Sequence, residues 1–324
     1  MAALPSEDDI IATLFAPIAG PGALGLEDDA ALIAPPVGHE IVATADAIVA
    51  GVHFYHDDPP ASIARKALRV NLSDLAAKGA DPLGFLLTMA LPAELPRQWL
   101  EDFAQALGAD ARTHKIALLG GDTVKTPGPL TLSITALGFV PMGRMVLRTG
   151  ARAGDCLYVS GTIGDAALGL RFRASASPLE DFQRWLVARY LEPQPRNALA
   201  SALRDCASGG MDVSDGLVGD CAKMLRASGV SAEIDLRRVP LSDAARAAIA
   251  REPKLFEQAM TGGDDYEILA SVAPGEAADF ERMAAKAGVP VARIGDVVAS
   301  DAAPVFLGLD GERRVFASGS YSHF

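Results

Sequence analysis

The chain has 324 residues, with 29 Lys and Arg against 41 Asp and Glu, so its formal net charge is −12. This acidic balance, without a dense cluster of basic residues, argues against nucleic acid as a partner. Half of the residues are hydrophobic and 22% are charged, which excludes a disordered chain and favours a folded protein of about two domains.

The cysteines and the apolar stretches indicate the cellular setting. Cys156, Cys206 and Cys221 form no Cys-x-x-Cys pair, so neither a disulfide framework nor a zinc ribbon is predicted. The first residues lack the basic start and apolar run of a secretory signal. Long uncharged stretches such as residues 126–143 are broken by Pro and Gly, which excludes a membrane span. We therefore expect a cytoplasmic protein with no membrane partner.

Strands and amphipathic helices are predicted in the first half of the chain. Residues 41–45 form an apolar strand that runs into Asp46, and residues 130–140 alternate with the period of a strand. Residues 61–80 have the spacing of an amphipathic helix, with Asn71, Asp74 and Lys78 on a polar edge. A second helix is predicted at 99–114, followed by a strand at 116–119 that ends in Gly-Gly-Asp.

The pattern breaks around residue 148 and a new series begins. Strands are predicted at 156–160, at 266–272 and at 292–296, and a further strand runs into the motif that begins at Met211. Helices are predicted after Asp165 and from Leu217 to about Ser228. We therefore predict two domains, residues 1–147 and 148–324.

Aspartates recur where a strand or a turn ends: Asp28, Asp29, Asp46, Asp74, Asp122, Asp212, Asp215, Asp264 and Asp265. Carboxylates are ligands of Mg²⁺, and Mg²⁺ can bring a polyanion such as a nucleotide to an acidic protein. Each single aspartate could instead be a turn former or a helix cap.

Three of these aspartate motifs contain small residues. Gly120-Gly121-Asp122-Thr123 and Gly262-Gly263-Asp264-Asp265 place carboxylates beside glycines, where a phosphate can approach the backbone. Asp212-Val-Ser-Asp-Gly216 combines two carboxylates, a hydroxyl and a helix N-terminus, although a simple N-cap remains the alternative.

Other nucleotide and metal motifs are excluded. Gly20-Pro-Gly-Ala-Leu-Gly25 follows no clear strand, which argues against a dinucleotide fold, and the chain has no Gly-Lys for a Walker A loop.

His53 is interpreted as lining a substrate pocket or as an ordinary loop residue. Arg148 is the best candidate for a cation that binds phosphate, with a solvated arginine as the alternative.

The order of the motifs resembles a known family. They are Glu27-Asp-Asp-Ala-Ala31, Thr44-Ala-Asp46, Gly51-Val-His-Phe54, Val70-Asn-Leu-Ser-Asp74, Gly120-Gly-Asp-Thr123, Leu147-Arg-Thr-Gly-Ala151, Met211-Asp-Val-Ser-Asp-Gly216, Gly262-Gly-Asp-Asp-Tyr-Glu267 and Tyr321-Ser-His-Phe324. Together they resemble the thiamine-monophosphate kinases, in the superfamily of aminoimidazole ribonucleotide synthetase and selenophosphate synthetase.

The resemblance implies a fold and a reaction. It implies an aminoimidazole ribonucleotide synthetase-like fold, with an N-terminal α/β domain whose sheet forms a barrel in a homodimer and a C-terminal α+β domain that closes the cleft. It implies ATP-dependent phosphorylation of thiamine monophosphate to thiamine diphosphate, by direct in-line transfer of the γ-phosphoryl group with several Mg²⁺ ions. Such catalysis relies on positioning and charge neutralisation.

The resemblance also implies roles for individual residues. The catalytic residues would be Asp122, Asp212 and Arg148, and those that contact ATP would be Gly121, Asp122, Arg148 and Ser214. The substrate would be bound by His53, Asp264 and Tyr321, and Mg²⁺ by Asp29, Thr44, Ala45, Asp46, Asp74, Asp122, Asp212 and Asp215.

Three positions depart from the family pattern. Ala45 stands where Thr or Ser is usual, so that a metal contact there would use the backbone carbonyl, Asp264 stands for Glu, and Ser322 for Asp or Asn. Two alternatives stay open: another ATP-dependent synthetase of the superfamily that acts on an amide, and, because of these departures, a catalytically silent nucleotide-binding scaffold.

Overall fold

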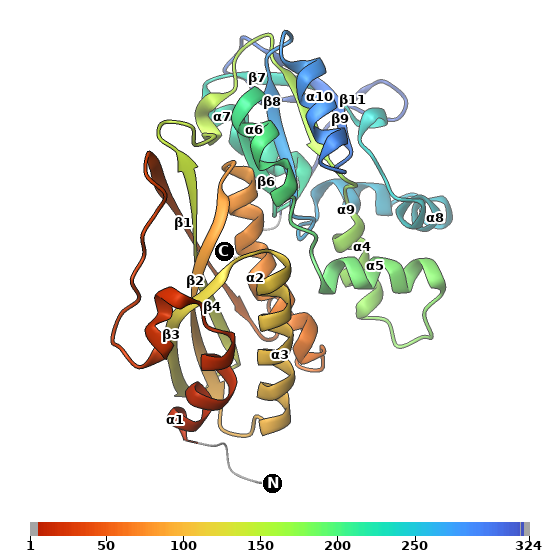
Figure 1. Ribbon diagram of the computed structural model, residues 1–324. Helices are drawn as coiled ribbons and strands as arrows, with labels where there is room; N and C mark the ends of the chain where they lie inside the picture. Colours follow the sequence, from red (N-terminus) through yellow and green to blue (C-terminus); the bar gives the residue numbers. More distant parts are fainter. Residues whose placement is uncertain (1–5, 318, 321–324) are drawn as a thin grey trace. The chain divides into compact units, whose positions relative to one another are not determined.

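The computed structural model describes residues 6–317, 319 and 320, and it divides into two compact units (Figure 1). The first unit contains residues 1–75 and 80–143, and the second contains residues 76–79 and 144–324. The predicted domains, 1–147 and 148–324, with the roles given to each, stay a prediction.

The first unit begins with short helical segments and continues into a sheet. The segments are α1 (Glu7–Ile10), η1 (Ile11–Phe15), η2 (Ala16–Ile18) and η3 (Pro21–Leu26). The strands are β1 (His39–Val49), β2 (Asp81–Pro92), β3 (Ala117–Thr126) and β4 (Thr131–Pro141), in the order β1-β4-β2-β3. The β2–β3 pair is parallel, whereas β4 runs antiparallel to both of its neighbours.

Helices α2 (Pro60–Ala77) and α3 (Arg97–Thr113) cover one face of this sheet. Alternate residues of β4, namely Leu132, Ile134 and Ala136, are buried in the core with Leu68 and Leu72 of α2. The opposite face stays open and carries exposed apolar side chains such as Ile41, Leu86 and Val124. The sheet of the first unit therefore has one face packed against α2 and α3 and one face that carries exposed side chains, which we call the open face.

The second unit is built around a seven-stranded mixed sheet, in the order β11-β10-β7-β9-β5-β8-β6. Its strands are β5 (Cys156–Ser160), β6 (Ala207–Val213), β7 (Ser231–Asp235), β8 (Glu267–Val272), β9 (Val291–Val298), β10 (Val305–Leu307) and β11 (Arg313–Arg314). The helices are α4 (Asp165–Arg173), α5 (Asp181–Leu191), α6 (Ala200–Cys206), α7 (Leu217–Ser228), α8 (Asp243–Arg251), α9 (Leu255–Thr261) and α10 (Ala277–Lys286), with single turns η4 (Arg148–Gly150), η5 (Asn197–Leu199) and η6 (Leu236–Arg238).

Two hydrophobic cores lie on the two faces of this second sheet. In β5, Leu157 and Val159 belong to the core that contains α7 and α9, while Tyr158 belongs to the core that contains α6 and α10. This alternation places every residue of β5 out of contact with solvent.

The structure confirms most of the predicted elements and corrects several boundaries: the helix predicted at 61–80 ends at Ala77, and the strand predicted at 41–45 spans His39–Val49. The strand 156–160 and the helix 217–228 have the expected bounds, and the predicted helices at 61–80 and 99–114 are α2 and α3. The strand predicted at 116–119 instead continues through Gly120 and Gly121 to Thr126, because β3 stays paired with β2 as far as Pro92. No helix among the described residues is long and apolar enough to span a membrane.

Candidate functional site

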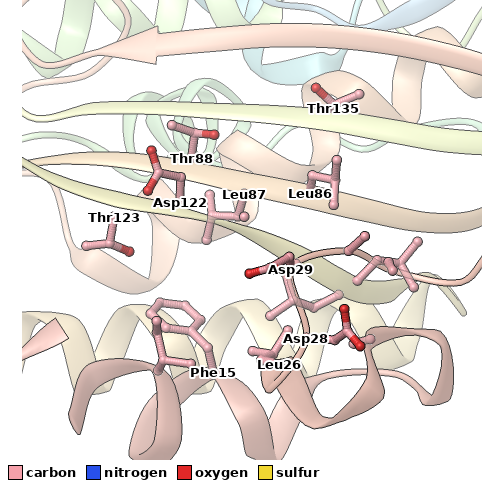
Figure 2. A pocket seen from close by; sticks show the side chains of 18 of the residues that line it. Phe15, Leu26, Asp28, Asp29, Leu86, Leu87, Thr88, Asp122, Thr123 and Thr135 are labelled. Carbon is pink, nitrogen blue, oxygen red and sulfur yellow. The ribbon is translucent and has the colours of Figure 1, made fainter. Parts of the chain in front are cut away.

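A pocket of about 720 Å³ lies in the first unit, between the helical segments near the N-terminus and the strands β2 and β3 (Figure 2). Asp28 and Asp29 line it from the loop after η3, and Asp122 and Thr123 line it from β3. These carboxylates are exposed. Apolar side chains complete the wall, among them Phe15, Leu26 and Leu86.

Gly121 is required by the close approach of two strands at this pocket. A Cβ at this position would lie 1.8 Å from the Leu87 carbonyl oxygen, so that a side chain could not be accommodated. The β2–β3 register shifts between Phe85 and Leu86, and from there Thr88 stands opposite Asp122. The glycines thus allow the strand to carry Asp122 on the open face.

Helix α2 contacts a second group of predicted ligands on β1. Thr44 donates its hydroxyl hydrogen to Asp74 Oδ2 at 2.5 Å, and the backbone N–H of Asp46 donates to Asn71 Oδ1 at 3.0 Å. Thr44 and Asp46 alternate with Ala45, which stands opposite Thr135 on the open face. The register therefore places Thr44 and Asp46 on the opposite face of the sheet from Asp122.

His53 lies in the tight turn that follows β1. The backbone N–H of Val49 donates to His53 Nδ1 at 3.1 Å, and the N–H of Gly51 donates to the carbonyl of Phe54 at 2.8 Å. Gly51 has a φ of +82°, which favours glycine, and Phe54 is buried in the core. The turn is therefore anchored at both ends.

Two loops of the second unit are joined by backbone hydrogen bonds. The N–H of Asp264 donates to the carbonyl of Ser214, and the N–H of Tyr266 donates to that of Val213, both at 2.8 Å. Asp264 and Tyr266 have φ values of +73° and +51°, an uncommon conformation outside glycine. A Cβ at Gly263 would lie 2.3 Å from the Ser214 carbonyl oxygen, which explains the glycine.

Buried acidic residues support these loops. Asp265 accepts the N–H groups of Gly164 and Ala166, at 2.6 and 3.2 Å, and burial raises the pKa of its carboxyl well above the usual range. Glu267 is fully buried and accepts hydrogen bonds from Ser160 and Arg196. Sequence reasoning included both residues in a motif but gave neither a role.

The remaining predicted ligands of the second unit differ in exposure. Asp212 is buried at the end of β6, and the Arg148 side chain is exposed. Asp215 is half-buried and forms an ion pair with Lys223. The fully buried Asp220 accepts the backbone N–H of Asp215 at 2.9 Å and also pairs with Lys223 at 3.0 Å.

Lys223 and Asp220 were not predicted from the sequence, because the α7 segment was recognised only as a helix.

The predicted metal ligands form several groups. Asp29 and Asp122 line one pocket, while Thr44 and Asp74 are bonded on the other side of the sheet. Among the residues that the structure describes, no three His, Cys, Asp or Glu side chains gather closely enough to hold an ion. Tyr321 lies outside the described residues. The donors are oxygen atoms, which suit Mg²⁺, and the assignment of residues to metal and substrate stays a prediction.

Comparison with known proteins identifies the class first. Residues 27–140 match the model of the AIR synthase related protein N-terminal domain, and residues 152–307 match that of the AIR synthase related C-terminal domain. The chain therefore has the two-domain AIR synthase-like fold that the sequence predicted.

The relatives then define the family. The thiamine-monophosphate kinase of Caulobacter vibrioides is 46% identical over 92% of this chain and 85% of its own. The crystal structure of thiamine-monophosphate kinase from Stenotrophomonas maltophilia is 38% identical, with a TM-score of 0.80, over 89% of this chain and 91% of that one. A structure described as AaThiL complexed with AMPPCP and TMP is 29% identical, with a TM-score of 0.80, over 92% of this chain and 91% of that one. The chain belongs to the thiamine-monophosphate kinase family.

Proposed function

We propose that this chain uses ATP to phosphorylate thiamine monophosphate to thiamine diphosphate, by direct in-line transfer of the γ-phosphoryl group. The observation that carries the proposal is the 46% identity to a thiamine-monophosphate kinase over 92% of the chain, which includes both domains. The related structure complexed with AMPPCP and TMP supports the choice of substrates.

The acidic residues suit several Mg²⁺ ions. Bound Mg²⁺ would neutralise the two phosphate groups that have to meet and would align them. Asp29 and Asp122 would hold ions at the pocket, since their carboxylates are exposed there. The other ligands would be Thr44, the Ala45 carbonyl, Asp46, Asp74, Asp212 and Asp215.

The chain's own groups would bind and orient the two substrates. Gly121 offers ATP a backbone without a side chain, and Arg148 offers a guanidinium that can bind phosphate oxygens in a bidentate manner. Ser214 would contact ATP through its hydroxyl, while His53, Asp264 and Tyr321 would bind thiamine monophosphate. Because a phosphate monoester is already ionised near neutral pH, no general base is required. Catalysis by Asp122, Asp212 and Arg148 would consist of positioning and charge stabilisation.

We also propose a cytoplasmic homodimer. The open face of the first sheet supports this, because Ile41, Leu86 and Val124 are exposed there with fractions of 40%, 37% and 46%. Exposed apolar side chains on a sheet face that no helix covers support a protein interface there. A second copy would cover the face and close the two sheets into a barrel.

The test incubates the purified protein with ATP, Mg²⁺ and thiamine monophosphate and measures the thiamine diphosphate formed by chromatography. Controls contain EDTA, or free thiamine in place of the monophosphate. Metal-dependent product from the monophosphate alone supports the proposal. Turnover of formylglycinamidine ribonucleotide without thiamine diphosphate would favour a synthetase, and ATP binding without any ADP release would favour a silent scaffold.

A further inference from the structure

Lys66 is a charged residue buried in the first unit, with an exposed fraction of 2%. Burying an ammonium group is costly unless the structure provides hydrogen-bond partners for it. One of its hydrogen bonds, at 2.9 Å, goes from Nζ to the backbone carbonyl of His53. A lysine of α2 thus binds the turn that carries a predicted substrate ligand.

The His53 ring is oriented by a second contact in the same turn. The backbone N–H of Val49 can only donate, so Nδ1 of His53, at 3.1 Å, has to be an acceptor. An imidazolium would place two N–H groups against each other at this contact. This hydrogen bond assigns the ring the tautomer that carries its proton on Nε2.

Lys66 belongs to a polar series along α2. Asn71, which is fully buried, accepts the N–H of Asp46, and Asp74 accepts the hydroxyl of Thr44. One helix therefore contacts β1 and its following turn at three places. The predicted ligands Thr44, Asp46 and His53 are placed relative to one another by this helix.

We propose that Lys66 is a positioning residue that, with the Val49 amide, orients His53 so that the neutral ring presents its Nε2–H to an acceptor oxygen of the substrate. The phosphate of thiamine monophosphate offers only acceptors, which suits such a donor. This inference rests on the proposed function, since that function makes His53 a substrate ligand. Lys66 itself does not touch the substrate.

The kinetic test compares Lys66→Met and Lys66→Arg with Arg69→Met. Arg69 is another cation of α2, half-buried, but it pairs with Asp110 of α3 at 2.7 Å and so provides a control on the same helix. Loss of the Lys66 contact should raise KM for thiamine monophosphate about ten-fold, with kcat and KM for ATP changed less than about two-fold. Lys66→Arg should restore most of the affinity, and Arg69→Met should leave KM unchanged. Equal effects of Lys66→Met and Arg69→Met, or an equal loss in all constants, would overturn the proposal.

A second readout does not depend on activity. Nitrogen NMR of the labelled histidines, with His53 assigned by a His53→Gln variant, reports which ring nitrogen carries the proton. We expect Nε2–H in the wild type and a changed His53 signal in Lys66→Met, but not in Arg69→Met. An Nδ1–H ring, or a His53 signal that Lys66→Met leaves unchanged, would refute the positioning. If the wild type forms no thiamine diphosphate, the proposed function fails, while the NMR result still decides whether Lys66 orients His53.

Discussion

The Asp265 carboxylate accepts the backbone N–H of Gly164 at 2.6 Å, and so joins the loop before β8 to the start of α4. Burial raises the pKa of this carboxyl, so the folded chain binds its proton more readily than the unfolded chain does. The contribution of Asp265 to the free energy of unfolding is then fully present below the ordinary aspartate pKa. It is lost as the pH rises toward the raised pKa of the folded state.

Asp265→Asn should remove this pH dependence. The amide keeps the shape of the side chain but does not ionise, so the stability of the wild type relative to the variant should fall as the pH rises from about 4. Thermal unfolding of both proteins between about pH 4 and pH 8 measures the difference. Parallel stability curves would show that Asp265 does not titrate as expected.

Asp122→Asn should lower kcat by at least about a hundred-fold, because the proposed function uses this carboxylate to neutralise phosphate charge. The melting temperature should hardly change, since the residue is exposed on an edge strand. Asp102→Asn is the control, because Asp102 bonds to Gln98 on α3 at 3.0 Å and has no proposed role. Near-normal turnover of a folded Asp122→Asn protein would remove Asp122 from the catalytic residues.

Val124→Asp should convert the proposed dimer into a monomer, because it puts a charge on the open face of the first sheet. Val37→Asp is the control, since Val37 is 101% exposed in the loop before β1. Analytical ultracentrifugation of the wild type and both variants gives the masses. A wild-type monomer, or a dimer that survives Val124→Asp, would refute an interface at this face.

Glu267→Gln should destabilise the second unit by about 3 kcal/mol, because it leaves buried arginine charge without its partner. The fully buried carboxylate pairs with Arg196 and Arg189, whose side chains are 20% and 14% exposed. Glu257→Gln breaks an exposed pair with Arg314 and should cost about 0.5 kcal/mol or less. Denaturant unfolding compares the two, and a similar small loss in both would contradict the assigned role of Glu267.

Elements with a clear local pattern were predictable from the sequence. The helix 217–228 has a glycine on each side and an amphipathic period, and the strand 156–160 is bounded by Asp155 and Gly161. Strand β2 was not predicted, because its long apolar run lacks the alternation of a half-exposed strand. Its pairing with β3 also extends that strand through Gly120 and Gly121, where local propensity is weak.

The sequence by itself determined the family, the two-domain fold and the set of acidic motifs, because these depend on residue types in a fixed order along the chain. Only the tertiary structure decided that Asp29 and Asp122 line one pocket while Thr44 and Asp46 face α2. The physical reason is that strand register selects the face of each side chain, and register depends on long-range pairing. The contact between Lys66 and His53, thirteen residues apart, likewise arises only when α2 packs against the sheet.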